Sequence, residues 1–136
     1  MATKSVLLVD DDLSVRLSLP PVLASSEVEV CTAASFEEAA SMLEASTFDL
    51  VITDLRLSGT LELEGLELIE RIKRRSPGSE VVLLTGFGSA ELTTEAIKRG
   101  ATETWEKSIS IQEIVVRVRA LGIPVAVSGS YRSRSS

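Results

Sequence analysis

The chain has 136 residues, of which 44% are hydrophobic, and its 14 Lys and Arg against 20 Asp and Glu give a formal net charge of −6. A single cysteine, Cys31, excludes internal disulfides and multi-cysteine zinc sites, and the absence of histidine excludes Ser-His-Asp triads, imidazole metal ligands and phosphohistidine on this chain. The acidic balance argues against general affinity for DNA phosphates or anionic membranes. Without histidine and with one cysteine, any chemistry on this chain has to use carboxylates, hydroxyls, lysine or a hard metal ion.

Short apolar runs alternate along the chain with stretches of helical period. The runs expected to form strands are Val6–Val9, Val28–Cys31, Leu50–Ile52, Val81–Leu84 and a weaker one near Thr104 and Trp105. The expected helices are Leu13–Ala24, Phe36–Ala45, Leu66–Arg75, Ser89–Arg99 and Ile111–Leu121. Continuous runs rich in β-branched residues are typical of strands buried on both faces of a parallel sheet. The alternation therefore predicts an α/β fold, a doubly wound five-stranded parallel sheet with helices on both faces.

Local signals predict where some helices begin and break. Patterns of the form Ser-x-x-Glu beginning at Ser35 and Ser110 are capping boxes, which start helices. Pro20 and Pro21 fall inside the first expected helix, where each removes a backbone donor. We expect that helix to kink or break between Arg16 and Pro21.

The chain is expected to form one domain over residues 1–123, followed by a flexible tail or linker stub over residues 124–136. The tail is rich in serine, and its only charges are those of Arg132 and Arg134. Near the start, Lys4 is followed by only five apolar or small residues before Asp10, too few for a signal peptide or a membrane span. This pattern and the lone thiol predict a cytoplasmic protein.

Potentially reactive side chains follow four of the expected strands. They are Asp10, Asp11 and Asp12 after the first strand, Asp54 after the third, Thr85 and Gly86 after the fourth, and Lys107 after the fifth. Because the carboxyl ends of parallel strands share one edge of the sheet, we expect these groups to meet there. Each alone has an ordinary explanation, such as a helix cap for Asp12 or a surface position for Lys107, but four together are an improbable coincidence.

This set of residues predicts a carboxylate that accepts a phosphoryl group. The carboxylates of Asp10, Asp11 and Asp54 suit Mg²⁺, and the charges of Mg²⁺ and Lys107 would neutralise them. An ionised Asp54 could then attack phosphorus without facing uncompensated negative charge. Lys107 and the Thr85 hydroxyl would hold oxygens of the transferred group.

The same residues carry a resemblance to a known family. The motifs are SVLLVDDD from Ser5, FDLVITDLRL from Phe48, EVVLLTGFGS from Glu80 and IKRGA from Ile97, followed by Lys107. Over about residues 4–121, the chain resembles the receiver domain of two-component response regulators.

The resemblance implies roles for individual residues and partners. It implies that Asp54 is phosphorylated, that Thr85 is the switch hydroxyl and that Lys107 pairs with the phosphate. It also implies that Mg²⁺ is held by Asp10, Asp11, Asp54 and the backbone carbonyl of Arg56. A histidine kinase or phosphotransfer protein would supply the phosphoryl group, and an effector protein or domain would read the result. The chain would be a signalling switch rather than a turnover enzyme. It would bind no nucleic acid and no membrane. Dimerisation on phosphorylation is left open.

The chain also departs from the usual receiver pattern. Ser108 replaces a proline after the lysine, and Thr104 stands where an aromatic switch residue is usual. The neighbouring Trp105 either substitutes for that aromatic residue or simply packs. The stretch from Thr60 to Glu64 resembles a small insertion beside the site.

Two other classes of protein compete with this interpretation. The sequence Asp-x-Asp-x-Ser from Asp10 resembles haloacid-dehalogenase-type phosphatases, but these need an acidic pair on a later strand, and Glu113 is the only acid after Lys107. A pseudo-receiver, which would bind a partner without being phosphorylated, remains the alternative.

Overall fold

The computed structural model describes residues 3–54, 63–86 and 90–125. Five parallel strands form one sheet in the order β2-β1-β3-β4-β5. The strands are β1 (Lys4–Val9), β2 (Val28–Ala33), β3 (Leu50–Asp54), β4 (Glu80–Thr85) and β5 (Glu103–Glu106). The helices are α1 (Leu13–Ser18), α2 (Pro20–Leu23), α3 (Phe36–Ala45), α4 (Leu63–Arg75), α5 (Ala90–Arg99) and α6 (Ile111–Ala120).

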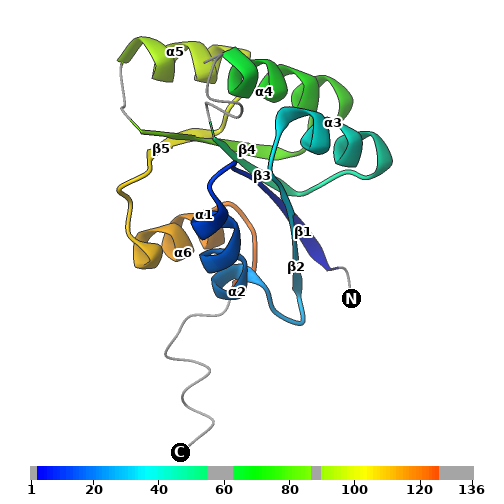
Figure 1. Ribbon diagram of the computed structural model, residues 1–136, viewed down its shortest axis with the longest axis vertical. Helices are drawn as coiled ribbons and strands as arrows, with labels where there is room; N and C mark the ends of the chain where they lie inside the picture. Colours follow the sequence, from blue (N-terminus) through cyan, green and yellow to red (C-terminus); the bar gives the residue numbers. More distant parts are fainter. Residues whose placement is uncertain (1–2, 55–62, 87–89, 126–136) are drawn as a thin grey trace, which may run out of the picture.

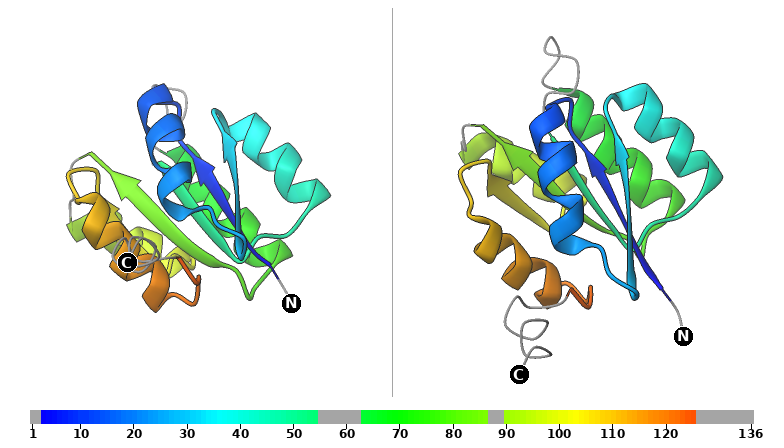
Figure 2. Two further views of the ribbon diagram at one scale, coloured as in Figure 1. Left: turned by 90° about the horizontal axis from the view of Figure 1, so that it is seen from below. Right: turned by 60° about the horizontal axis from the view of Figure 1, so that its bottom comes forward.

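The sheet lies between two layers of helices, as Figure 1 and the turned views in Figure 2 show. Helices α1, α2 and α6 lie on one face, and α3, α4 and α5 lie on the other. This arrangement confirms the predicted doubly wound α/β fold. None of the helices in the described ranges is long and apolar enough to cross a membrane.

Strand β1 shows why the apolar runs predicted buried strands. Val6 and Leu8 pack into the cluster shared with α2 and α6, whereas Leu7 and Val9 pack into the cluster shared with α3, α4 and α5. All four side chains are 0% exposed. Burial of each contributes roughly 1.5–3 kcal/mol, so the sheet is held from both faces.

The first predicted helix is broken at its prolines, as expected. Helix α1 ends at Ser18, and Pro20 begins α2, where its missing N–H costs no helical hydrogen bond. Leu19 and Leu23 are buried, but none of the six residues of α1 is. The α2 segment therefore anchors this part of the chain in the core.

Both predicted capping boxes begin helices. The hydroxyl of Ser35 accepts the N–H of Glu38 at 3.1 Å, and that of Ser110 accepts the N–H of Glu113 at 3.0 Å. The Glu38 carboxylate also accepts the N–H of Ala34, whereas the Glu113 carboxylate pairs with an arginine one turn later. Each cap satisfies a backbone donor that the helix itself leaves unpaired.

Helix α4 begins earlier than the sequence predicts. Its first residue is Leu63 rather than Leu66, so the last two residues of the expected insertion, Leu63 and Glu64, belong to the helix. The helix thus includes Gly65, although glycine has low helix propensity. Gly65 is itself buried in the folded chain, so tertiary packing outweighs that local preference.

Ordered packing continues two residues past the expected domain end at residue 123. Ile123 and Val125 are 2% and 1% exposed in the cluster that includes α6. The Arg119 guanidinium donates to the Val125 carbonyl at 2.6 Å, which fastens this segment to the helix. The rest of the expected tail lies outside the described residues.

Gly100 follows α5 in a backbone conformation that favours glycine. Gly100 has φ of +118°, and a Cβ there would lie 2.6 Å from Cγ of Lys73, whose ammonium donates to the carbonyls of Pro77 and Ser79. We expect Gly100→Ala to lower the free energy of unfolding by roughly 1–3 kcal/mol, measured by urea denaturation. Gly78→Ala is the control and should stay within about 0.5 kcal/mol of the parent, because a Cβ there meets nothing within 4 Å. Equal losses in the two variants would contradict the argument.

Candidate functional site

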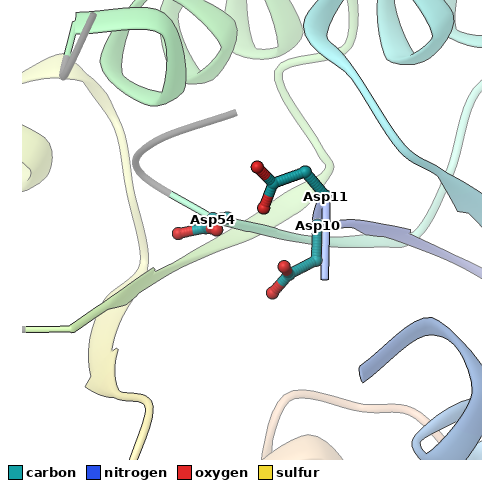
Figure 3. Close-up of side chains that lie close together, drawn as sticks. All are labelled: Asp10, Asp11 and Asp54. Carbon is teal, nitrogen blue, oxygen red and sulfur yellow. The ribbon is translucent and has the colours of Figure 1, made fainter. Parts of the chain in front are cut away.

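Three carboxylates meet at the carboxyl edge of the sheet, as Figure 3 shows. Asp10 directly follows β1, and its N–H bonds to the carbonyl of Ala33 at 3.0 Å, which extends the pairing with β2. Asp54 is the last residue of β3. Carboxylate oxygens of Asp10, Asp11 and Asp54 lie within 4.8 Å of one another. Asp10 and Asp54 are buried and Asp11 is exposed, so the cluster opens to solvent on one side.

Lys107 joins this cluster from the end of β5. Its Nζ lies 2.9 Å from Oδ2 of Asp54 and 3.4 Å from Oδ2 of Asp10. Its backbone N–H donates to the carbonyl of Thr85 at 2.8 Å, which ties the loop after β5 to the end of β4. The lysine therefore bridges two carboxylates that are 44 residues apart in the sequence.

Burial and charge act differently on the two partners of this ion pair. Burial raises the pKa of Asp10, and the charge of Asp54 adds to this, although the Asp12 amide and Lys107 oppose it. Burial alone would lower the pKa of Lys107, but its hydrogen bond to Asp54 and the charges of both carboxylates raise it above the usual value. The lysine is thus held in its charged form beside a carboxylate that resists ionisation.

One buried oxygen of Asp10 is incompletely satisfied. Oδ1 accepts the N–H of Asp12 at 2.9 Å, whereas Oδ2 has the 3.4 Å ion-pair contact with Nζ of Lys107 but no hydrogen bond of good geometry within the described part of the chain. A buried oxygen without a hydrogen bond costs about 1–3 kcal/mol, and the charge of Lys107 offsets part of that cost. A hard divalent cation between Asp10, Asp11 and Asp54 would satisfy it, so the donor set fits Mg²⁺.

The other residues predicted for the site are Thr85, Asp12 and Arg56. Thr85 is the last residue of β4, is 4% exposed and lies opposite Glu106 in the register. Asp12 caps α1, as expected, because its Oδ1 accepts both the N–H and the hydroxyl of Ser14. Arg56 lies outside the described residues.

The sequence did not lead us to predict Arg16 as a residue of the site. Its Nη1 donates to the backbone carbonyl of Asp10 at 2.9 Å. Side chains on a helix lean toward its N-terminus, so an arginine four residues after the cap at Asp12 can reach back over the start of the helix. That spacing was the available signal.

The two residues near the usual switch position lie on opposite faces of β5. The Thr104 hydroxyl lies 3.3 Å from that of Thr93 on α5. Trp105 is 3% exposed in the cluster with α6, and its indole N–H donates to Glu103 at 2.6 Å. Trp105 therefore packs into the core on the face away from α5.

Comparisons with known proteins agree on one family. The family model described as response regulator receiver domain matches residues 6–119. The response regulator protein PilR of Pseudomonas aeruginosa is 30% identical over 98% of this chain, which spans only 30% of PilR.

Solved structures share the fold. A CheY-like receiver domain protein from Methanospirillum hungatei superposes with a TM-score of 0.79 and 25% identity, covering 88% of this chain and 93% of that one. The solution structure of the beryllofluoride-activated NtrC4 receiver domain dimer has a TM-score of 0.78 and 31% identity, covering 88% and 96%.

Proposed function

The chain belongs to the response regulator receiver domain family, and from this premise we propose that it is a switch that accepts a phosphoryl group on Asp54. The observation that carries the proposal is the contact of Lys107 with both Asp10 and Asp54 at an edge where three carboxylates converge. A structural ion pair needs one acid, whereas phosphoryl transfer needs clustered acids and a cation to manage the charge that develops.

The acceptor chemistry follows from the position of Asp54. A carboxylate oxygen of Asp54 attacks phosphorus and forms a new O–P bond while the bond from phosphorus to the donor breaks. The leaving group departs with that electron pair and takes a proton from solvent. Lys107, already 2.9 Å from Asp54, stays close enough to pair with an oxygen of the transferred group, and the Thr85 hydroxyl would contact another.

The proposed cofactor is Mg²⁺, held by Asp10, Asp11, Asp54 and the backbone carbonyl of Arg56. When bound, it supplies charge neutralisation at the phosphoryl oxygens. The buried Oδ2 of Asp10 supports this assignment, because its contact with Lys107 at 3.4 Å is not a hydrogen bond and leaves it able to bind a cation.

The proposed partners are a phosphoryl donor and an effector. The sequence has no histidine, and we propose that a histidine kinase or phosphotransfer protein supplies the phosphoryl group from a phosphohistidine, in the cytoplasm. A downstream effector protein or domain would read the phosphorylated state. Because the similar NtrC4 domain is described as an activated dimer, we include self-association on phosphorylation in the proposal.

Incubation with Mg²⁺ and acetyl phosphate tests the acceptor role. We expect one base-labile phosphoryl adduct by intact mass, and none with Asp54→Asn, because an amide is a far weaker nucleophile. Asp49→Asn is the matched control: Asp49 precedes β3, binds the Ser5 amide at 2.8 Å and should leave adduct formation unchanged.

Two outcomes would contradict the proposal: no adduct on the parent chain, or an undiminished adduct on Asp54→Asn. Absence of both the adduct and Mg²⁺ binding would favour the pseudo-receiver. Turnover of free phosphomonoesters would favour a phosphatase.

A further inference from the structure

The backbone of Asp10 is fastened to helix α1 by a charged side chain. Asp10 lies just past the end of β1 at Val9, and its N–H bonds to the carbonyl of Ala33 on β2 at 3.0 Å. Its own carbonyl accepts a hydrogen bond from Nη1 of Arg16 at 2.9 Å. A hydrogen bond from a charged donor is roughly twice as strong as a neutral one, so this contact constrains the backbone of the residue whose buried Oδ2 has no hydrogen bond.

Helix α1 packs against the core cluster through the half-buried Val15, and most of its other residues are exposed. It is six residues long, none of them buried, and Leu13 and Leu17 are 57% and 65% exposed. Its start is fixed by the Asp12 cap, and its end continues into α2. The Arg16 contact joins the body of α1 directly to the backbone of the carboxylate cluster.

We propose that Arg16 is a positioning residue for the cation site, holding the backbone at Asp10 so that Asp10 and Asp11 present their oxygens together. This inference rests on the proposed function, since it concerns the same cation. The guanidinium binds a carbonyl rather than a carboxylate, so it positions the acidic residues without occupying the oxygens that a metal needs.

Whether the Kd for Mg²⁺ rises or falls when Arg16 is replaced separates a positioning role from a purely electrostatic one. A fixed positive charge near three carboxylates repels an incoming divalent cation, so removing it should tighten binding if charge alone mattered. If Arg16 acts by positioning, removing it should weaken binding, because loss of groups that orient metal ligands typically costs 10–100-fold in affinity. A residue that only stabilised the fold would leave the affinity of the folded protein unchanged.

The experiment is a calorimetric titration of the full chain with MgCl₂. Arg16→Met keeps much of the apolar stem and removes charge and donors; we expect its Kd to rise about 10-fold or more, with Arg16→Lys recovering most of the loss. Arg75→Ala is the matched control, because Arg75 also donates to a backbone carbonyl, that of Glu44 at 2.6 Å, but on the opposite face of the sheet. Its Kd should equal that of the parent.

An unchanged or lower Kd for Arg16→Met would overturn the inference while leaving the proposed function intact. Absence of Mg²⁺ binding by the parent chain would instead overturn the proposed function. Circular dichroism checks that each variant is folded, and Arg16→Gln provides the same comparison if Arg16→Met does not fold. Hydrogen exchange at the Asp12 amide gives a readout free of metal, and we expect faster exchange in the variant.

Discussion

Lys107→Met should lower the free energy of unfolding of the metal-free protein by about 2–3 kcal/mol. The lysine ammonium is the cation bonded to Asp54 at 2.9 Å and paired with Asp10 at 3.4 Å, and both carboxylates are buried. Removing one partner of a fully buried ion pair costs about 3–5 kcal/mol. The Lys107 side chain is 33% exposed, so solvent screening reduces that figure.

Urea denaturation in EDTA measures this loss, with Lys98→Met as the control. Lys98 lies exposed on α5 away from the cluster, and its replacement should change stability by less than about 0.5 kcal/mol. Adding Mg²⁺ should recover part of the loss in Lys107→Met, because a divalent cation restores positive charge between the carboxylates. Equal stability of the two lysine variants in EDTA would contradict the proposed electrostatic role.

Asp10→Asn should make the metal-free protein more stable at neutral pH. Burial raises the pKa of this carboxyl in the folded state, so the folded protein retains the proton to a higher pH than the unfolded chain does. Stability contributed by the protonated form is present at low pH and is lost as pH rises through the folded-state pKa. The asparagine variant carries no such penalty, so its advantage should appear as pH increases and vanish in acid.

The same substitution should abolish stabilisation by Mg²⁺. At a free concentration 100 times Kd, a ligand adds about 2.7 kcal/mol to the parent protein, whereas Asp10→Asn should gain little. Unfolding curves across a pH series, in EDTA and in Mg²⁺, give both results, with Asp49→Asn as the control. A variant less stable than the parent in EDTA at neutral pH would show that the buried carboxylate is not a net cost.

The sequence predicted the strand-end cluster because parallel strands constrain it. Once Asp54 and Lys107 follow strands of one sheet, their side chains have to meet at its carboxyl edge. The break at Pro20 was likewise predictable, because it depends on local backbone chemistry.

Features that depend on tertiary contacts were not predictable in this way. The early start of α4 places Gly65 inside the helix, where it is buried, and this packing overrides its poor helix propensity. The packing of Val125 depends on its contact with Arg119. The Arg16 bond depends on where α1 lies relative to the end of β1, which hydrophobic periodicity does not specify.

The placement of Trp105 gives the protein an intrinsic optical label. It is the only tryptophan of the chain, it is 3% exposed, and it faces the α6 side of the sheet two residues before Lys107. Its emission therefore reports the packing beneath α6 rather than the solvent in the carboxylate pocket. A change in that emission on cation binding or phosphorylation would register a structural change carried along β5 from its carboxyl end into the core.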